Sequence, residues 1–539
     1  MDYTAHVKTN RTVEKKNATL VTPQSQPIPG KNMVQNSAGG YSFELSDWDR
    51  LERFLILGSE GGTFYASEKQ LTKKNAKCVE RLLKKEVDGL NVVRKIVEIS
   101  AAGRAHKNDP AIFALAMASA AKHNSVRKAA LQAIPDVCRI GTHLFHYAQF
   151  VEAFRGWGRG LREAVAKWYS EKDLDSLMYQ VMKYKQRDGW SHRDLLRLSH
   201  PLPSSDTIST LFKWIVSPDE VRLEQHGELA RLAAAELCST STNEDQIVDL
   251  IEQFSLPREV INTSMLNRIP VWEALLQNMP LNAMVRNLGK MSSLELFKNK
   301  NNLKKVVEAL HNEDAIRKAK LHPLAILIAH ETYKTGHGLK GSLTWKTVED
   351  IMDSLDDAFY LSFSAIEPAN KRFLLGIDVS GSMSSPISGA PSVSCAVASA
   401  VMAMVTRRTE GESIIRGFAN SFKDLDIRKR DTLESAITKV RNQNFGGTDC
   451  SLPMIYAMKN NLEIDTFVVY TDNETWAGNI QPVQALRDYR RKSGIPAKLI
   501  VVGMSTTGFT IADPNDSGMM DVVGFDADTP AVISGFARE

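Results

Sequence analysis

The sequence predicts a protein of two parts, an all-α array of helical repeats followed by an α/β domain with a parallel sheet. Its 539 residues exceed what one hydrophobic core fills, because single cores stop growing near ~250 to 300 residues. From about Glu68 to Leu361, apolar residues recur three and four positions apart, which is the spacing of amphipathic helices. After Ala369, short runs of Ile, Val, Leu and Phe alternate with helical segments, as in parallel sheets covered by helices.

The composition is that of an ordinary folded protein with reduced thiols. From Lys371 onward, 18 Lys and Arg stand against 19 Asp and Glu, and 49 stand against 44 before it. The small basic excess therefore belongs to the helical part. The five cysteines lie far apart without a Cys-x-x-Cys pair, which favours reduced thiols over disulfides or a zinc site. Because no signal peptide or long apolar run is evident, we expect a cytoplasmic chain with no membrane partner.

The N-terminal residues are expected to be a disordered tail. Residues 1–40 are rich in Asn, Gln, Lys, Ser, Pro and Gly and offer little to bury. Order is expected to begin near Tyr41, and Ser46 is placed to cap a helix in "LSDWDRLERFLIL". The run "GSEGGTFY" that follows predicts a glycine-rich loop.

The helical part reads as a long series of paired helices. The segment "DPAIFALAMASAA" begins with Asp109 as a cap and Pro110 in the first turn. The next segment, "NSVRKAALQAIPDVCRI", has the same helical spacing of apolar residues. No repeat of fixed period is obvious, but such a series is typical of an α-solenoid of degenerate repeats. A helical bundle of two separate domains is the alternative.

Three segments of the α/β part place small oxygen-bearing side chains at the ends of predicted strands. "FLLGIDVSGSM" breaks from an apolar run into Asp378, Ser380 and Ser382; "NFGGTDC" puts Thr448 in a glycine-rich loop; and "FVVYTDNE" ends a strand at Asp472. Ligands of parallel sheets bind beyond the carboxyl ends of the strands. Taken singly, such residues often only satisfy loop backbone groups. Taken together, in this order along an alternating strand–helix sequence, the three segments resemble the metal-ion-dependent adhesion site (MIDAS) of von Willebrand factor A domains.

The chemistry of this set favours a hard divalent cation. All twelve histidines precede Lys371, so oxygen ligands remain, and these suit Mg²⁺ first, with Mn²⁺ and Ca²⁺ as alternatives. The resemblance implies that Asp378 and Asp472 act through water or by hydrogen bonding the ligating hydroxyls. An ion held mainly by neutral oxygens would accept an outside anion, a carboxylate or a phosphate. No general base in motif form accompanies the set, so we expect a binding protein and no enzyme.

A second constellation combines cations with aromatic residues between positions 122 and 200. Trp157, Trp168 and Tyr169 lie among the cations, and flat rings stack on unpaired bases while cations neutralise phosphates. The spacing places Lys183 with Arg187, and Arg193 with Arg197, on shared helix faces, and Ser191 with Asp194 forms a capping box. An ordinary solvated helix face is the alternative. The candidate RNA-binding residues are Lys122, His123, Arg127, Lys128, Arg155, Arg159, Arg162, Lys167, Lys183, Lys185, Arg187, His192 and Arg193.

Several motifs in order resemble the Ro autoantigen family of TROVE-domain proteins, and especially its bacterial members. They are "LGSEGGTFY", "CRIGTHLF", "KYKQRDGWSHRDLLRLSH" and "KLHPLAILIA", followed by the adhesion-type domain. The resemblance implies a HEAT-like helical ring over residues 41–370, closed by a von Willebrand factor A domain over residues 371–539. It makes Lys185, Arg187 and His192 the leading candidates for RNA contact.

The resemblance also implies partners. In this family, small noncoding Y RNAs bind the outer basic surface, and single-stranded 3′ ends of misfolded or structured RNAs enter the central hole. In bacteria, Y RNA tethers a 3′–5′ exoribonuclease, polynucleotide phosphorylase. We therefore expect a monomeric, noncatalytic ring that acts in RNA quality control as part of a ribonucleoprotein. The alternatives are a metal-dependent protein-adhesion scaffold whose basic surface is incidental, and a metal-dependent enzyme such as a phosphoesterase.

Overall fold

The computed structural model describes residues 21–539 apart from 59–75, 339–340, 364–365, 388–389, 442, 444–445 and 506. Apart from Gly58, the predicted glycine-rich loop "GSEGGTFY" falls within the gap 59–75 and so lies outside the described residues. Within the described ranges, no helix has both the length and the apolar character needed to span a bilayer.

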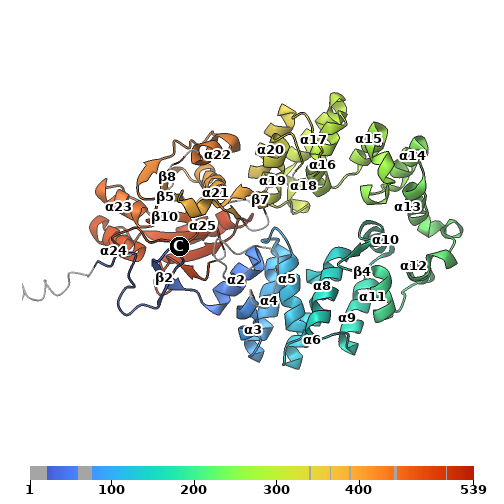
Figure 1. Cartoon of the computed structure of the whole chain (residues 1–539), viewed down its shortest axis with the longest axis horizontal. Coiled ribbons are helices and arrows are strands. Elements are labelled where there is room, and N and C mark those ends of the chain that lie inside the picture. The colour runs from blue at the N-terminus through green and yellow to red at the C-terminus, as the bar shows by residue number, and fades with distance from the viewer. Residues whose placement is uncertain are drawn as a thin grey trace, which may run out of the picture.

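A curved series of helices forms the larger part of the protein (Figure 1). It contains α2 (Asp47–Leu57), α3 (Lys77–Leu82), α4 (Glu86–Ala102), α5 (Asp109–Ser119), α6 (Asn124–Gln132), α7 (Ile134–Val137), α8 (Gly141–Phe154), α9 (Arg159–Ser170), α10 (Leu174–Lys183), α11 (His192–Ser199), α12 (Asp206–Val216), α13 (Ala230–Thr240), α14 (Glu244–Phe254), α15 (Ile269–Gln277), α16 (Leu281–Ser293), α17 (Lys300–His311), α18 (Glu313–Lys318), α19 (Pro323–Lys334) and α20 (Glu349–Leu361). The predicted all-α array is thereby confirmed.

The helices close into a ring. The series leaves the α/β domain with α2, passes through α8 to α15, and returns to that domain with α19 and α20 (Figure 1). Its two ends also meet each other, because the imidazoles of His106 and His322 pack edge to face at 5.5 Å between centroids. Nearby, Lys320 donates a hydrogen bond to the Ala101 carbonyl. The ring expected from the family resemblance is therefore present.

Local signals in the sequence explain where several helices begin. Ser46 caps α2, and its hydroxyl accepts from the Asp49 backbone N–H while the Asp49 carboxylate accepts from the Ser46 N–H. Ser191 and Asp194 form the same reciprocal capping box at the start of α11. Both of these caps were predicted. For α5, the N-cap is Asn108, and Asp109 is the first helical residue.

The C-terminal part is an α/β domain built on a six-stranded sheet of order β13-β11-β10-β5-β8-β9. All neighbours pair in parallel except β8 with β9, which are antiparallel. The strands are β5 (Arg372–Asp378), β8 (Glu412–Phe418), β9 (Phe422–Asp424), β10 (Thr466–Thr471), β11 (Lys498–Gly503) and β13 (Met519–Val523). The helices are α21 (Cys395–Thr409), α22 (Leu433–Arg441), α23 (Leu452–Lys459), α24 (Pro482–Ser493) and α25 (Thr529–Arg538). The predicted parallel sheet is confirmed.

The expectation of a disordered tail is wrong for residues 21–40. This segment, which we call the N-terminal strap, lies against the α/β domain, and β1 (Met33–Gln35) joins β2 (Tyr41–Glu44) and β12 (Phe509–Thr510) in a small antiparallel sheet. The strap has few apolar side chains, but its amides bond to loops of the α/β domain. Gln24 is fully buried and Asn36 is 5% exposed. Composition alone overlooks order that rests on polar contacts.

Candidate metal centre and nucleic-acid interface

The sheet brings the five predicted metal-site residues to one edge. Asp378 is the last residue of β5, and Asp472 directly follows β10, the strand beside it. Ser380 is the N-cap of the short 3₁₀ helix Gly381–Ser384, and Ser382 lies within that helix. Thr448 lies in the loop before α23, and its carbonyl accepts hydrogen bonds from the backbone N–H groups of residues 476 and 477 at 3.0 Å. The Thr448 loop is thereby fixed to the Asp472 loop.

Four side chains of this set have polar contacts that define their positions. One Asp378 carboxylate oxygen accepts from the Ser380 backbone N–H at 2.9 Å, and the other accepts from the Thr471 hydroxyl at 2.7 Å. The hydroxyls of Ser380 and Ser382 are 3.1 Å apart. Asp472 accepts from the Glu474 N–H through Oδ1, while its Oδ2 is buried without a hydrogen-bond partner among the described residues.

Burial makes two ionised carboxylates costly here. Desolvation raises the pKa of Asp378 to about 7, and the charge of Asp472 adds to this effect. Burial likewise raises the pKa of Asp472. Burial disfavours the ionised form of each side chain, and a cation between them would remove that penalty. With an unpartnered carboxylate oxygen on Asp472 and the adjacent hydroxyls of Ser380 and Ser382, the donor set fits a hard divalent ion.

Residues outside the predicted set hold the metal loops together. The Gln24 amide of the strap donates to Asp449 Oδ1 at 2.7 Å and accepts from the Thr475 hydroxyl, so it links the residues beside Thr448 and Asp472. Asn36 donates to the Thr475 carbonyl at 2.7 Å. The sequence carried no signal for this role, because strap and loops are more than 400 residues apart.

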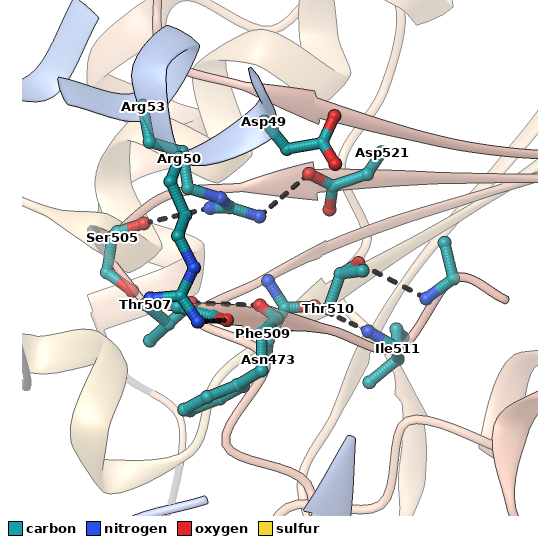
Figure 2. A network of polar contacts seen from close by, with 12 residues as sticks. Asp49, Arg50, Arg53, Asn473, Ser505, Thr507, Phe509, Thr510, Ile511 and Asp521 are labelled. Carbon is teal, nitrogen blue, oxygen red and sulfur yellow. Dashed lines mark hydrogen bonds and ion pairs between the residues drawn. The ribbon is translucent and has the colours of Figure 1, made fainter. Parts of the chain in front are cut away.

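A second network connects the metal loops to the helical ring (Figure 2). Arg53 of α2 is 1% exposed; it forms an ion pair with Asp521 of β13 at 2.7 Å and donates to the Ser505 carbonyl at 3.3 Å. Beside it, the Asn473 side chain accepts from the Ile511 N–H at 3.1 Å. Asn473 directly follows Asp472, so the first helix of the ring and the metal loop share one polar cluster.

Most predicted RNA-binding residues lie in or directly beside α6, α8, α9, α11 and the hairpin of β3 (Gln186–Arg187) and β4 (Trp190–Ser191), which are neighbours in the ring (Figure 1). Some are engaged in the protein itself: Arg159 pairs with Glu163, Lys167 with Glu171, and Arg187 with Asp188. Exposed residues for which the described part of the chain offers no ion-pair partner are Lys122, Lys128, Arg162, Lys185 and Arg193.

Other predicted RNA-binding residues support the local structure. The guanidinium of Arg127 donates to the carbonyls of residues 121 and 122, and that of Arg155 donates to Ser119 O at 2.7 Å. The imidazole of His123 lies 3.0 Å from the Lys84 carbonyl. Lys183 donates to the Tyr179 hydroxyl at 2.8 Å. The side chains of these residues are therefore partly committed to contacts within the protein.

The structure buries His192, which the sequence placed among the leading RNA contacts. Its side chain is 3% exposed, its Nδ1 lies 2.8 Å from the Tyr169 hydroxyl, and desolvation lowers its pKa to about 4. A neutral, buried imidazole is placed to organise α11 and not to contact phosphate. Trp168 and Tyr169 are buried as well, at 1% and 0% exposure, so neither ring is free to stack on a base.

The shared helix face predicted for Lys183 and Arg187 is also wrong. Lys183 ends α10, whereas Arg187 belongs to a hairpin of β3 (Gln186–Arg187) and β4 (Trp190–Ser191). Asp188 and Gly189 form its two-residue turn with φ of 51° and 79°, the left-handed values that an Asp-Gly pair tolerates. The second predicted pair, Arg193 and Arg197, does share α11.

Comparison with known proteins supports one family across both parts. The TROVE domain matches residues 34–260 and 254–335, and the Ro60 vWA domain matches residues 372–537. The chain belongs to the Ro family of TROVE-domain proteins. A protein of Deinococcus radiodurans named RNA-binding protein RO60 is 40% identical over 524 residues, covering 96% of this chain and 98% of its own length.

Two further relatives agree with this assignment. RNA-binding protein RO60 of Caenorhabditis elegans is 34% identical over 579 residues, covering 93% of this chain and 90% of its own. The crystal structure of the Deinococcus radiodurans RO (RSR) protein superposes with a TM-score of 0.72 at 39% identity, covering 92% of this chain and 99% of that one. The relationship therefore extends over the ring and the von Willebrand factor A domain together.

Proposed function

We propose that this protein is a noncatalytic RNA-binding ring that holds small noncoding Y RNA and the single-stranded 3′ ends of misfolded or structured RNAs. It would act in RNA quality control as part of a ribonucleoprotein, with Y RNA tethering a 3′–5′ exoribonuclease such as polynucleotide phosphorylase. The names of the relatives support the RNA part of this proposal. The finer partners rest on the family resemblance of the sequence motifs.

The observation that carries the proposal is the set of exposed cations Lys122, Lys128, Arg162, Lys185 and Arg193, which we call the unpaired basic set. An exposed cation that forms an ion pair is already partly neutralised, whereas these five form no ion pair with the described residues. They lie on contacting elements of the ring, so one polynucleotide backbone could follow them. Phosphates that replace bound counterions at such a surface gain affinity that depends strongly on salt.

The metal centre is proposed to bind one divalent cation, with Mg²⁺ preferred over Mn²⁺ or Ca²⁺. Ser380, Ser382 and Thr448 would hold it directly, and Asp378 and Asp472 would act through water or by hydrogen bonding the ligating hydroxyls. Bound there, the ion would supply an electrophilic position for an acidic group of a partner. The chain's own contribution is to bury the carboxylates and to fix the turn that carries Ser380 through the hydrogen bond from its backbone N–H to Asp378.

Fluorescence anisotropy with a structured RNA that carries a free single-stranded 3′ end tests the RNA proposal. We expect affinity to fall steeply between 50 and 200 mM salt, by orders of magnitude if several phosphates are contacted. The triple variant Lys122→Glu, Lys185→Glu, Arg193→Glu should bind more weakly and show a shallower salt dependence. The matched control is Lys300→Glu, Lys346→Glu, Lys459→Glu, which makes the same charge change at other exposed sites. Equal losses in both triples, or affinity indifferent to salt, would contradict a localised RNA surface.

The alternative function is a metal-dependent adhesion scaffold, and one observation favours it. Trp476 is 45% exposed in the loop whose backbone bonds to Thr448, so an apolar side chain stands beside the metal centre. A pulldown from lysate, before and after RNase and with or without EDTA, separates the two functions. Partners that survive RNase but are lost with EDTA would support adhesion, and partners lost with RNase would support the ring as an RNA carrier.

A further inference from the structure

A cavity of ≈ 540 Å³ lies in the helical ring between α16 and α19, away from the metal centre and from the unpaired basic set. In Figure 1 these two helices lie on the returning side of the ring, close to the α/β domain. Its volume is within the range of small-ligand sites, about 300 to 1,000 Å³. Neither the metal chemistry nor the proposed RNA surface makes use of it.

One wall of the cavity is formed by closely packed aromatic side chains. The rings of Trp345 and Tyr333 lie nearly parallel, 20° apart in plane and 6.0 Å between centroids, and the indole N–H donates to the Tyr333 carbonyl at 2.9 Å. Gly289 of α16 lies against this indole, since a β-carbon there would come within 2.8 Å of it. A glycine in mid-helix makes the helix less stable than an alanine would, so this cost has to be compensated by the close packing that the glycine permits.

Two polar side chains of the lining have unused hydrogen-bonding groups. The hydroxyl oxygen of Thr332 and the Nδ1 of His106 are shielded from solvent and have no partner among the described residues. Burial lowers the pKa of His106 to about 4, so the imidazole is neutral near pH 7 and can donate or accept. Buried polar atoms are nearly always paired, and unpaired ones indicate a missing partner.

The charges of the lining all have one sign. Arg258, Arg286 and Lys290 border the cavity, and its described lining contains no Asp or Glu. Arg258 donates to the Asn287 side chain and Lys290 to the Asn267 side chain, so neutral amides leave both charges uncompensated. Arg286 is exposed, and its side chain makes no hydrogen bond or ion pair with the described part of the chain. An anionic group is therefore the complement of this rim.

We propose that the cavity binds a mononucleotide unit, with the base against the Trp345–Tyr333 wall and the phosphate toward Arg286 and Lys290. A base supplies the flat apolar body and the edge donors and acceptors for Thr332 and His106, and a phosphate supplies the anion. A free nucleotide and the terminal nucleotide of a strand share this chemistry. The site goes beyond the proposed function, because it uses none of the residues of the unpaired basic set or of the metal centre.

Isothermal titration of RNA-free full-length protein with adenosine 5′-monophosphate tests the site, with adenosine as the neutral probe. We expect adenosine monophosphate to bind with a dissociation constant at or below about 1 mM, and adenosine to bind more weakly. Arg286→Glu should weaken the monophosphate about tenfold and leave adenosine unchanged. Ala329→Phe fills the cavity from α19 without removing a polar contact and should abolish both. Ala153→Phe, at an exposed position of α8, is its matched control.

A second arm uses a short single-stranded oligoadenylate to identify the source of the nucleotide. If Ala329→Phe abolishes binding of the monophosphate alone, the cavity takes free nucleotide; if it also weakens the oligonucleotide, the cavity takes a strand end. Absence of monophosphate binding to the folded wild-type protein overturns the proposal. So does binding that Ala329→Phe and Arg286→Glu both leave unchanged. The triple variant Lys122→Glu, Lys185→Glu, Arg193→Glu should leave the affinity for the monophosphate unchanged. The RNA-surface proposal and the nucleotide-site proposal can therefore be refuted separately.

Discussion

Asp378 and Asp472 are buried carboxylates at the ends of the neighbouring parallel strands β5 and β10, and the charge of Asp472 raises the pKa of Asp378. Two such groups destabilise the folded state at neutral pH unless a cation compensates them. We therefore expect Mg²⁺ to raise the free energy of unfolding, by about 2.7 kcal/mol at one hundred times its dissociation constant. Thermal unfolding with Mg²⁺ and with EDTA measures this.

The control for that prediction is a pair of amide variants. Asp378→Asn should lose most of the Mg²⁺-dependent stabilisation, because it removes a buried charge that the ion would compensate. Asp424→Asn changes an exposed carboxylate of the same domain, with a side chain 69% exposed, and should respond like wild type. The metal assignment fails if Asp378→Asn is stabilised by Mg²⁺ as much as wild type is.

The strap residue Gln24 should control the metal loops from a distance in sequence. Gln24→Ala leaves the Asp449 and Thr475 side chains without their buried partner, so we expect a loss of ~1–3 kcal/mol in stability and a weaker affinity for Mg²⁺. The exposed strap residue Gln35 provides the matched control Gln35→Ala. Unfolding in EDTA separates the two effects, and Mg²⁺ affinity equal to wild type would limit Gln24 to a structural role.

The ion pair between Arg53 and Asp521 should hold the first helix of the ring on the α/β domain. Arg53→Met leaves Asp521 with an unpaired charge, and breaking one side of a buried pair costs about 3–5 kcal/mol. The double variant Arg53→Met, Asp521→Asn should regain part of this loss, because no lone charge remains. Urea unfolding of both variants and of Asp521→Asn completes the cycle; strictly additive losses would argue against direct coupling.

The sequence was informative where function depends on short-range pattern. Small oxygen donors after apolar runs and in a glycine-rich loop pointed to Asp378, Ser380, Ser382, Thr448 and Asp472, and parallel pairing of β5 with β10 brings the strand ends that carry Asp378 and Asp472 together as expected, while metal binding there stays a prediction. The sequence did not predict that the N-terminal strap is ordered, because its order comes from amide contacts with loops more than 400 residues away in the sequence. Burial of His192 escaped detection too, since a histidine among cations has the same local pattern whether it faces solvent or the core.

Buried His192 should make the protein sensitive to acid. In the unfolded chain a histidine has a pKa near ~6.5, whereas burial lowers the pKa of His192 to about 4. The unfolded state therefore binds the proton first, and stability falls as pH drops from about 6.5 to about 4. A shift of this size corresponds to about 3 kcal/mol at most, since each pKa unit is worth about 1.4 kcal/mol. Below that range, the contribution becomes constant.

Comparing wild type with His192→Gln isolates this contribution from the other titrating groups. The variant loses the ring contacts of His192, so it should be less stable than wild type at pH 7. Because glutamine does not titrate, the difference should shrink as the pH approaches 4.5, and urea unfolding at both pH values measures it. A difference that stays constant would mean that His192 titrates near its normal pKa and is solvated, which would restore it as a candidate for direct phosphate contact. With His192 buried, we expect RNA affinity to depend instead on the exposed cations Lys185 and Arg193.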